Sequence, residues 1–355
     1  MTDIAIIGAG PYGLSLAAHL AHEGLNIRIF GQPMHTWCTG MPEGMVLKSE
    51  GFASNLWDPD GAFTLRDYCR ETGIPYKDSG LPVPLDTFCD YGVSFQKRFV
   101  PMLDQRWVKH VSRKAEGFTL QLDDDEMVSA KRVVLAAGIR DFYVLPAELD
   151  AISGPRLSHS ADHRRLDPFI GKKALVIGGG ASGVGLAALM SQRGAEATVA
   201  ARKPRIAWCG PPAERSLLEK IKEPESGLGT GWRSMACVVA PMVFYHMPRD
   251  FRHMVVRKHL GPAPGWTSRD EVERNVRVLL GAKIARSAIV GGVASVTFNM
   301  EDGGEQTVEA DHVIAATGYR IDMRRFRFLG QDLLAAVKTE YSAPTLSPYF
   351  ETSVP

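Results

Sequence analysis

Cysteine is scarce in this sequence, and its spacing matches neither common metal sites nor common redox sites. The 355 residues contain only Cys38, Cys69, Cys89, Cys209 and Cys237, and no two of them are three positions apart. A Cys-based zinc site and a secreted disulfide scaffold are therefore not expected, and the composition fits a reducing cytoplasm. The histidines show no Glu-anchored pair at helical spacing, so no metal site is expected.

Long apolar runs and an excess of one charge are also missing. Asp3 comes early, and no basic region precedes the first short apolar run, which is unlike a secretory signal. No stretch approaches the roughly 20 apolar residues that span a bilayer. Lys plus Arg number 41 against 40 for Asp plus Glu, a net charge of +1, so the chain has no overall field to bind nucleic acid. The acidic run Asp123–Glu126 is expected to be an exposed turn.

Glycine is in excess, with 35 residues in the chain against a usual share of about 7%. Several glycines belong to a pattern that occurs twice. The apolar run Ile4–Ile7 precedes the turn Gly8–Gly13, and Ala174–Ile177 precedes the turn Gly178–Gly183. Each turn is followed by a helical stretch, a glycine stop and a second apolar run. This order predicts strand, glycine turn, helix and strand in both places.

Short alternating strands follow each of these units. They are expected at 107–111, 118–122 and 127–129, and again at 288–289, 294–300 and 306–310. Each set closes on a buried strand that ends in small residues, at 132–138 and 312–318. The predicted fold class is α/β, with two Rossmann-like dinucleotide-binding domains. Each domain carries an antiparallel β-meander, and the second is inserted into the first.

A Gly-x-Gly-x-x-Gly turn between a strand and a helix is typical of dinucleotide binding. The first glycine makes the tight turn, the second lets the backbone approach a pyrophosphate, and the third allows close helix–strand packing. The helix N-terminus then offers N–H groups and partial positive charge to the phosphates. A nearly neutral protein can therefore hold an anionic dinucleotide. Such turns also serve packing alone, but the strand–turn–helix context in both copies favours binding.

The ends of the second strands distinguish the two ligands. The second unit has Arg202 and Lys203 where an acid normally binds ribose hydroxyls. Cations at this place favour the 2′-phosphate of NADPH over NADH, the alternative being a solvated basic turn. The first unit has Gly31 and Gln32 at the matching place, with no carboxylate. Gln32 is the candidate to hydrogen-bond ribose there.

Together these motifs resemble the flavin-dependent, NADPH-using monooxygenases, which include flavin-containing monooxygenases and lysine or ornithine N-hydroxylases. The resemblance rests on residues 8–17, on 178–183 and on the closing Ala-Thr-Gly-Tyr at 316–319. Residues 152–163 depart from the family fingerprint, which indicates a divergent branch. The resemblance implies an FAD-binding domain in 1–147, an NADPH-binding domain in 148–318, and an incomplete return to the FAD-binding domain in 319–355.

The resemblance also assigns the binding residues. It gives the FAD pyrophosphate to Gly8, Gly10, Pro11, Tyr12 and Gly13, and NADPH to Gly178, Gly180, Ser182, Gly183, Arg202 and Lys203. It places Thr317, Gly318 and Tyr319 on the linker back to the flavin domain. The irregular segment 205–275 is expected either to control substrate entry or to be a packing or dimer element.

The implied chemistry belongs largely to the cofactors. NADPH reduces FAD, oxygen adds at flavin C4a, and the resulting (hydro)peroxide hydroxylates a small molecule at nitrogen or sulfur. The partners are thus a small-molecule substrate and molecular oxygen. Asn55 is the candidate to hydrogen-bond the reacting flavin or the NADP+ amide, the alternative being a turn asparagine that bonds its own backbone. Trp37 is a candidate to pack on the flavin, the alternative being an ordinary core role.

Three other functions are considered. A disulfide reductase of the two-dinucleotide type is disfavoured because no Cys-x-x-Cys is present. An NADPH-dependent flavin reductase without oxygenation stays open. So does a non-catalytic nucleotide-binding relative, because the ribose acid is missing from the first unit.

Overall fold

The computed structural model describes residues 1–212, 216–226, 228–259 and 261–354. Its α-helices are α1 (Pro11–His22), α2 (His35–Gly40), α3 (Leu65–Thr72), α4 (Leu85–Phe99), α5 (Ala181–Gln192), α6 (Leu217–Lys222), α7 (Trp232–Val239), α8 (Pro241–His246), α9 (Arg249–His259), α10 (Arg269–Asn275) and α11 (Gln331–Ala336). Its strands are β1 (Thr2–Ile7), β2 (Ile27–Phe30), β3 (Val108–Arg113), β4 (Phe118–Leu122), β5 (Met127–Leu135), β6 (Leu157–His159), β7 (Lys173–Ile177), β8 (Glu196–Ala201), β9 (Glu225–Ser226), β10 (Gly229–Thr230), β11 (Arg277–Leu280), β12 (Lys283–Val290), β13 (Val293–Asn299), β14 (Glu305–Ala310), β15 (His312–Ala315), β16 (Thr339–Glu340) and β17 (Ala343–Pro344).

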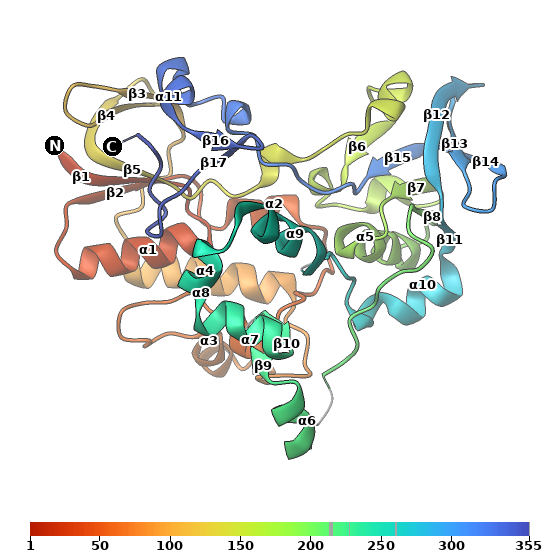
Figure 1. The fold of residues 1–355 in the computed structure, drawn as a ribbon, viewed down its shortest axis with the longest axis horizontal. Coiled ribbons are helices and arrows are strands. Elements are labelled where there is room, and N and C mark those ends of the chain that lie inside the picture. The colour runs from red at the N-terminus through yellow and green to blue at the C-terminus, as the bar shows by residue number, and fades with distance from the viewer. Residues whose placement is uncertain (213–215, 227, 260, 355) are drawn as a thin grey trace.

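The first sheet has the strand order β2-β1-β5-β4-β3 (Figure 1). β2, β1 and β5 run parallel, and β4 and β3 continue the sheet antiparallel. Alternate residues of a strand face opposite sides of a sheet. Ile6 accordingly packs in a core with α1 and α4, whereas Ala5 and Ile7 pack in a second core with residues 323–333. The first sheet is therefore covered on both faces.

The first meander is not separate from the parallel sheet. The expected strands at 127–129 and 132–138 form one continuous strand, β5, which pairs with β4 through its first half and with β1 along most of its length. No glycine or proline interrupts the stretch between Ser129 and Arg132, so nothing breaks the extended chain there. The expectation of two strands is wrong at this place.

The second sheet is fully parallel, in the order β11-β8-β7-β15-β6. Val176 of β7 faces a core with α5 and α10. Leu175 and Ile177 face the separate antiparallel sheet β12-β13-β14 through residues such as Phe298. The edge strands β6 and β11 were not expected from the sequence. They have only three and four residues, which is too short for a clear periodicity.

Two extended segments connect the sheets and lie side by side. The chain leaves the first sheet through residues 142–145 and returns through 318–320 (Figure 1). The Val144 amide donates to the Gly318 carbonyl at 3.1 Å, and the Arg320 amide donates to the Phe142 carbonyl at 2.8 Å. Residues 323–334 then pack on the first sheet. The first sheet and residues 323–334 make up the first lobe. The second sheet lies between them along the chain, and with the antiparallel sheet β12-β13-β14 it makes up the second lobe.

The helices α6–α9 lie between β8 and α10 in the sequence, within the segment 205–275. This segment reaches the C-terminal residues of the chain. The Tyr245 hydroxyl donates to the Leu346 carbonyl at 3.2 Å, and His253 Nε2 lies 2.7 Å from the Glu340 carboxylate. α6 projects away from the rest of the molecule (Figure 1). Among the described residues, no helix has the length and apolar character needed to cross a membrane.

Candidate dinucleotide-binding sites

The first glycine turn leaves β1 at the carboxyl end of the parallel strands. A Cβ at Gly8 would lie 2.3 Å from the Ala136 carbonyl oxygen, and one at Gly13 would lie 1.9 Å from the Gly8 carbonyl oxygen. Both positions therefore exclude any side chain because the backbone packs too closely. A Cβ at Gly10, by contrast, would meet nothing within 4 Å. The middle glycine faces open space, where a ligand can approach the backbone.

The second glycine turn repeats this arrangement at the end of β7. A Cβ at Gly178 would lie 2.2 Å from the Ala316 carbonyl oxygen, and one at Gly183 would lie 2.3 Å from the Gly178 carbonyl oxygen. The middle glycine differs from its counterpart. A Cβ at Gly180 would lie 3.2 Å from Pro262, so the segment that contains Pro262 lies over the second turn.

Both turns open directly onto helix N-termini. α1 and α5 each have 12 residues, and their N-cap residues, Gly10 and Gly180, make no side-chain cap. The first backbone N–H groups of these helices are therefore left for another acceptor. They also lie at the positive end of the helix dipole, which stabilises a phosphate. Pro11, at the first helical position of α1, has no N–H group, so no donor is left without a partner at that position. Ser182 is exposed in the first turn of α5.

The end of β2 has a different construction from the end of β8. Gly31 has φ +120°, and its amide donates to the Asp104 carbonyl. The Gln32 side-chain amide donates to the Gln105 carbonyl at 2.7 Å, so its carbonyl oxygen and its second N–H are left for a ribose. His35 and Trp107 meet edge to face beside Gly31, with ring centroids 5.2 Å apart. The sequence reasoning missed this aromatic pair, because position 107 was read only as the start of a strand.

An ion-pair cluster holds the segment with Trp107 against β2. The Asp104 carboxylate lies 2.6 Å from Arg28 and 2.7 Å from Arg106. Hydrogen bonds from Arg106, and then from Arg28, hold the pKa of Asp104 well below its usual range. Arg106 also binds Asp124 and Glu126. The acidic run is thus a turn, as expected, but it also anchors the neighbouring loop.

The loop that contains Asn55 is fixed to its surroundings by backbone contacts. The Asn55 side-chain amide donates to the Phe52 carbonyl, and its oxygen accepts from the Leu65 amide, both at 2.9 Å. One N–H and one lone pair stay available on this side chain. Trp37 is half-buried and packs edge to face on Phe88 at 4.9 Å. Tyr12, by contrast, is 88% exposed at the start of α1.

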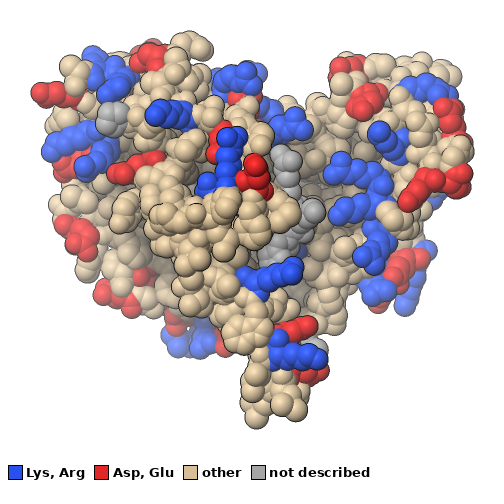
Figure 2. All heavy atoms as spheres, in the orientation of Figure 1, with Lys and Arg blue, Asp and Glu red and all other residues tan. Residues whose placement is uncertain are grey.

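Arg202 and Lys203 follow the end of β8 directly, beside the second glycine turn. Both side chains are exposed, and neither makes an ion pair or hydrogen bond with any other described residue. The Lys203 carbonyl accepts from the Gly281 amide at 3.0 Å, which fixes the backbone at this place. Figure 2 shows Lys and Arg side chains gathered on the second lobe, along the recess between the lobes. The arrangement leaves two cations free to bind a phosphate.

The two connecting segments form the third part of the site. The Thr317 hydroxyl donates to the Val144 carbonyl, and Tyr319 pairs with Tyr143 across the two segments. His159, only 1% exposed, stacks on Tyr143 at 5.1 Å and meets the edge of Tyr319 at 5.3 Å. Burial lowers the pKa of His159. The neutral ring is therefore a rigid spacer between the two crossovers.

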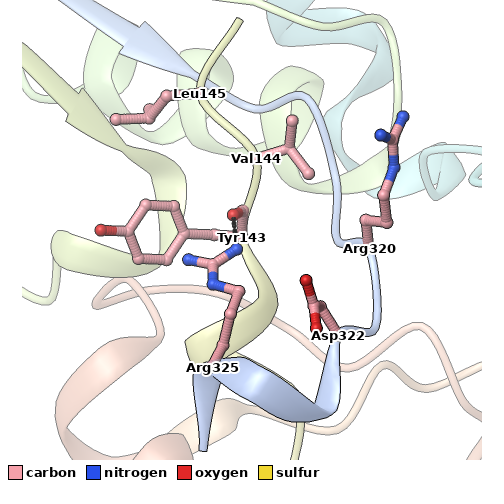
Figure 3. Close-up of a pocket in the computed structure, with 6 residues that line it drawn as sticks. All are labelled: Tyr143, Val144, Leu145, Arg320, Asp322 and Arg325. Atoms are coloured by element: carbon pink, nitrogen blue, oxygen red, sulfur yellow. Dashed lines mark hydrogen bonds between the residues drawn. The ribbon is translucent and has the colours of Figure 1, made fainter. Parts of the chain in front are cut away.

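A cavity of about 360 Å³ lies next to these segments (Figure 3). It is lined by Tyr143, Val144, Leu145, Arg320, Asp322 and Arg325. Arg325 donates to the Tyr143 carbonyl, and Asp322 is paired with Arg324. Arg320 makes no side-chain contact of this kind with the described residues. Its guanidinium is therefore the one in this cavity that can bind an anionic group without first breaking a described contact.

The comparison with protein families decides the wider identity. Residues 2–235 match the family model described as pyridine nucleotide-disulphide oxidoreductase. The chain belongs to this family. Membership makes it a flavin-dependent NAD(P)H oxidoreductase, for which the family implies FAD and NAD(P)H as cofactors. The first glycine turn fits that role because its middle glycine leaves the backbone open to a pyrophosphate.

Solved structures of related fold include several flavoenzymes. An ornithine N-hydroxylase from Kutzneria sp. 744 has 14% identity and a TM-score of 0.76, with 99% of this chain and 89% of that chain covered. A flavin-containing monooxygenase from Stenotrophomonas maltophilia has 20% identity and a TM-score of 0.65, covering 98% and 85%. A bacillithiol disulfide reductase from Staphylococcus aureus has 17% identity and a TM-score of 0.64, covering 99% and 87%. No curated protein matches the sequence.

Two further features of this pyridine nucleotide-disulphide oxidoreductase concern metal binding and the segment 205–275. The described residues contain no group of three or more His, Cys, Asp or Glu side chains arranged to hold a metal ion. The segment 205–275, part of which lies outside the described residues, contacts residues of the first lobe through Tyr245 and His253. The segment therefore bridges the two lobes that carry the glycine turns.

Proposed function

We propose that the protein is an FAD- and NADPH-dependent monooxygenase that hydroxylates a small molecule at a nitrogen or sulfur centre. The observation that carries the dinucleotide part is the repeated glycine turn. In each copy the outer glycines are closed by backbone packing. Both helix N-termini are uncapped, and the middle glycine of the first turn is open to a phosphate, whereas that of the second turn lies under Pro262. The turn after β1 would hold FAD, and the turn after β7 would hold NADPH.

The preference for NADPH follows from charge. Arg202 and Lys203 are exposed and unpaired within the described chain, and the sequence from Ala201 to Arg205 has no acid to accept ribose hydroxyls. A guanidinium and an ammonium bind a 2′-phosphate through charge-assisted hydrogen bonds, which the 2′-hydroxyl of NADH cannot replace. Pro262 lies over the middle glycine of this turn, so its segment shifts when the pyrophosphate binds.

The adenosine half of FAD would meet aromatic side chains in place of an acid. At the end of β2 the backbone at Gly31 leaves room, and Trp107 and His35 border the space. An aromatic face stacks on a purine ring at a gain of roughly 1–3 kcal/mol. That gain compensates for the missing carboxylate. We assign Trp107 to the adenine and the free Gln32 oxygen to the ribose.

Bound FAD would accept a hydride from NADPH and activate oxygen for transfer to the substrate. The protein's own residues bind and orient these groups. The crossovers at Tyr143 and Tyr319 set the distance between the two dinucleotides, with the neutral His159 ring packed between them. Arg320, in the adjoining cavity, would orient an anionic part of the substrate or cofactor. Oxygenation is supported by the fold shared with the ornithine N-hydroxylase.

The test begins with the purified chain reconstituted with FAD. We expect a bound flavin spectrum, anaerobic flavin bleaching by NADPH faster than by NADH, and oxygen consumption that forms hydroxylated product from an added amine or thioether. Gly10→Ala serves as the matched variant, because it blocks the backbone approach without a packing clash. Absence of bound flavin after reconstitution overturns the proposal. Bleaching by NADPH, with electrons passed only to quinones or to oxygen to give hydrogen peroxide, shows a reductase without oxygenation instead.

A further inference from the structure

A short strap, residues 261–265, covers the second glycine turn. An ideal Cβ at Gly180 would lie 3.2 Å from Pro262 Cβ and 3.3 Å from Pro262 Cγ. At Gly10, the matching position of the first turn, a Cβ would meet nothing within 4 Å. The middle glycine of such a turn is where the backbone approaches a pyrophosphate. In the second site, Pro262 therefore occupies space that a dinucleotide needs.

The strap is attached to the loop after β8 at one end and follows α9 at the other. The Cys209 amide donates to the Pro264 carbonyl at 2.9 Å, and Cys209 forms a parallel β-bridge with Gly265. Along the chain, Pro262 comes three positions after His259, the last residue of α9. Three residues of extended chain span at most about 11 Å. A large movement of Pro262 therefore also moves the end of α9.

One acidic side chain of the first lobe binds α9. The Glu340 carboxylate lies 2.7 Å from His253 Nε2 and also pairs with Arg249. Arg249 and His253 are four positions apart, so they lie on the same face of the helix. The Arg249 guanidinium lies over the Tyr341 ring at 5.2 Å, and the His253 ring meets Tyr341 edge to face at 4.6 Å. We call these four residues the latch.

The hairpin β16-β17 fixes the first-lobe side of the latch. Glu340 pairs with Ala343, so Tyr341 and Ser342 form a two-residue turn, and their φ angles are +51° and +68°. Positive φ at both positions is characteristic of the type I′ turn that suits a hairpin. The Met323 amide donates to the Ser342 carbonyl at 3.2 Å, and Met323 is buried in the core of the first lobe. Glu340 is therefore held in place by the first lobe.

Apolar packing contributes little to the position of α9. Phe251 and Met254 are each 42% exposed, and Val256 is 60% exposed. None of the described side chains of α9 belongs to the buried apolar cores of the two lobes. The position of the helix therefore depends strongly on the latch.

We propose that the strap is a lid on the second dinucleotide site and that the latch holds this lid shut. The proposal rests on the proposed function, because it takes this turn to be the NADPH site. NADPH binds after Pro262 leaves Gly180, and this movement separates α9 from Glu340. A closed latch and a bound dinucleotide therefore exclude each other. Since the apparent Kd is the intrinsic Kd divided by the open fraction, a weaker latch should tighten binding.

The experiment compares NADP+ with adenosine 2′-monophosphate by calorimetric titration of the full-length chain. FAD is kept in excess so that the first site is not free for NADP+. The monophosphate can reach Arg202 and Lys203 but has no pyrophosphate to place over Gly180, so it does not need an open lid. We expect Glu340→Ala and Arg249→Ala each to lower the Kd for NADP+ by about three- to tenfold, as expected for the loss of exposed ion pairs. The Kd for the monophosphate should not change.

Two further variants serve as controls. Glu340→Ala and Arg249→Ala change the net charge in opposite directions, so a general electrostatic effect would not tighten binding in both. Glu305→Ala removes an exposed carboxylate that pairs with Arg286 at 2.9 Å in the second lobe, and it should bind NADP+ like the wild type. Pro262→Gly removes the side chain over Gly180 and should tighten NADP+ binding while the latch stays intact.

Hydrogen exchange gives a second readout of the link between the latch and the lid. Saturating NADP+ should speed exchange of the α9 amides in the wild type, whereas the monophosphate should leave it unchanged. An unchanged or higher Kd for NADP+ in either latch variant overturns the lid, as does slower exchange in α9 with NADP+. If neither ligand binds to any variant, the nucleotide assignment itself fails, and the lid fails with it.

Discussion

The carbonyl oxygen of Ala136 occupies the space that any side chain at Gly8 would need. The distance to an ideal Cβ at Gly8 is 2.3 Å, and Gly8 also has φ +115°. Both conditions exclude residues other than glycine, because L-residues rarely adopt this backbone and the clash is with another backbone group. The end of β5 is thereby joined closely to the turn after β1. This close approach forms one wall of the first candidate dinucleotide site.

Gly8→Ala and Gly10→Ala should separate folding from binding in this turn. Gly8→Ala combines a strained φ with a backbone clash, and we expect it to lower the free energy of unfolding by at least about 2 kcal/mol. Gly10→Ala meets no atom within 4 Å and should cost less than about 1 kcal/mol, yet it should reduce FAD binding. Urea unfolding and flavin titration measure the two quantities. Equal flavin affinity in Gly10→Ala and the wild type would contradict the assignment.

Arg202→Ala and Lys203→Ala test the cofactor preference. Each loses one charge-assisted hydrogen bond to the 2′-phosphate, worth about 1.5–3 kcal/mol, so the KM for NADPH should rise roughly tenfold or more. The KM for NADH should not change, because NADH has no phosphate at that place. Arg277→Ala, at the opposite end of the second sheet, is the control. An equal rise in the KM for both nucleotides would contradict the assignment.

Trp107→Ala tests the aromatic pair at the end of β2. Loss of one stacked base contact, at roughly 1–3 kcal/mol, should weaken FAD binding about tenfold. Trp107→Phe keeps an aromatic face and should retain most of the affinity. The dissociation constant is measured by quenching of flavin fluorescence. If Trp107→Ala binds FAD as tightly as the wild type, the adenine lies elsewhere.

Asn55→Ala distinguishes a positioning residue from a catalytic one. The side chain ties residue 52 to residue 65 through two hydrogen bonds, so its loss should lower the free energy of unfolding by about 1–3 kcal/mol. If the remaining N–H also contacts the flavin or NADP+, as the family resemblance implies, kcat should fall in enzyme that still carries a full complement of flavin. An unchanged kcat at full flavin content leaves Asn55 with the loop role alone.

The repeated glycine motif is the part of the fold that the sequence predicted best. Apolar runs and glycine spacing located β1, β7, α1 and α5, because local patterns determine these elements. The closing residues Ala136 and Ala316 could not be recognised as packing partners, since only the folded chain brings them to Gly8 and Gly178. The same motifs predicted a flavin-dependent, NADPH-using oxidoreductase, and the match of residues 2–235 to the pyridine nucleotide-disulphide oxidoreductase family supports that class, while the monooxygenase activity stays a prediction.

The pairs that the sequence did not predict are those made across the fold. Trp37 and Phe88 lie far apart in the sequence, and they meet only because α2 packs on α4. His35 and Trp107 likewise come from separate segments that β2 and the Arg106 cluster bring together. A single sequence carries periodicity and turn chemistry but does not state which helix face meets which. Tertiary pairs of this kind therefore need the structure.

The Ser158 hydroxyl lies between two histidines, 2.6 Å from His163 Nε2 and 2.7 Å from His312 Nε2. A hydroxyl has one proton and two lone pairs, so one neutral ring can accept from Ser158 while the other donates to it. The cluster can therefore be satisfied with both rings neutral and in different tautomers. Burial, and then His163 and Lys172, lower the pKa of His312 to about 4. Burial also lowers the pKa of His163.

Protonation of this cluster should make folding stability depend on pH below neutrality. In the unfolded chain a histidine has a pKa of about 6.5. Between that value and about 4, the unfolded chain therefore binds a proton that folded His312 excludes. The part of the free energy of unfolding that depends on His312 is then greatest above pH 6.5. It falls as the pH falls, and the loss reaches about 3 kcal/mol by pH 4. Urea unfolding at several pH values should show a flatter decline for His312→Gln than for the wild type. Parallel curves for the two proteins would show that another group causes the decline.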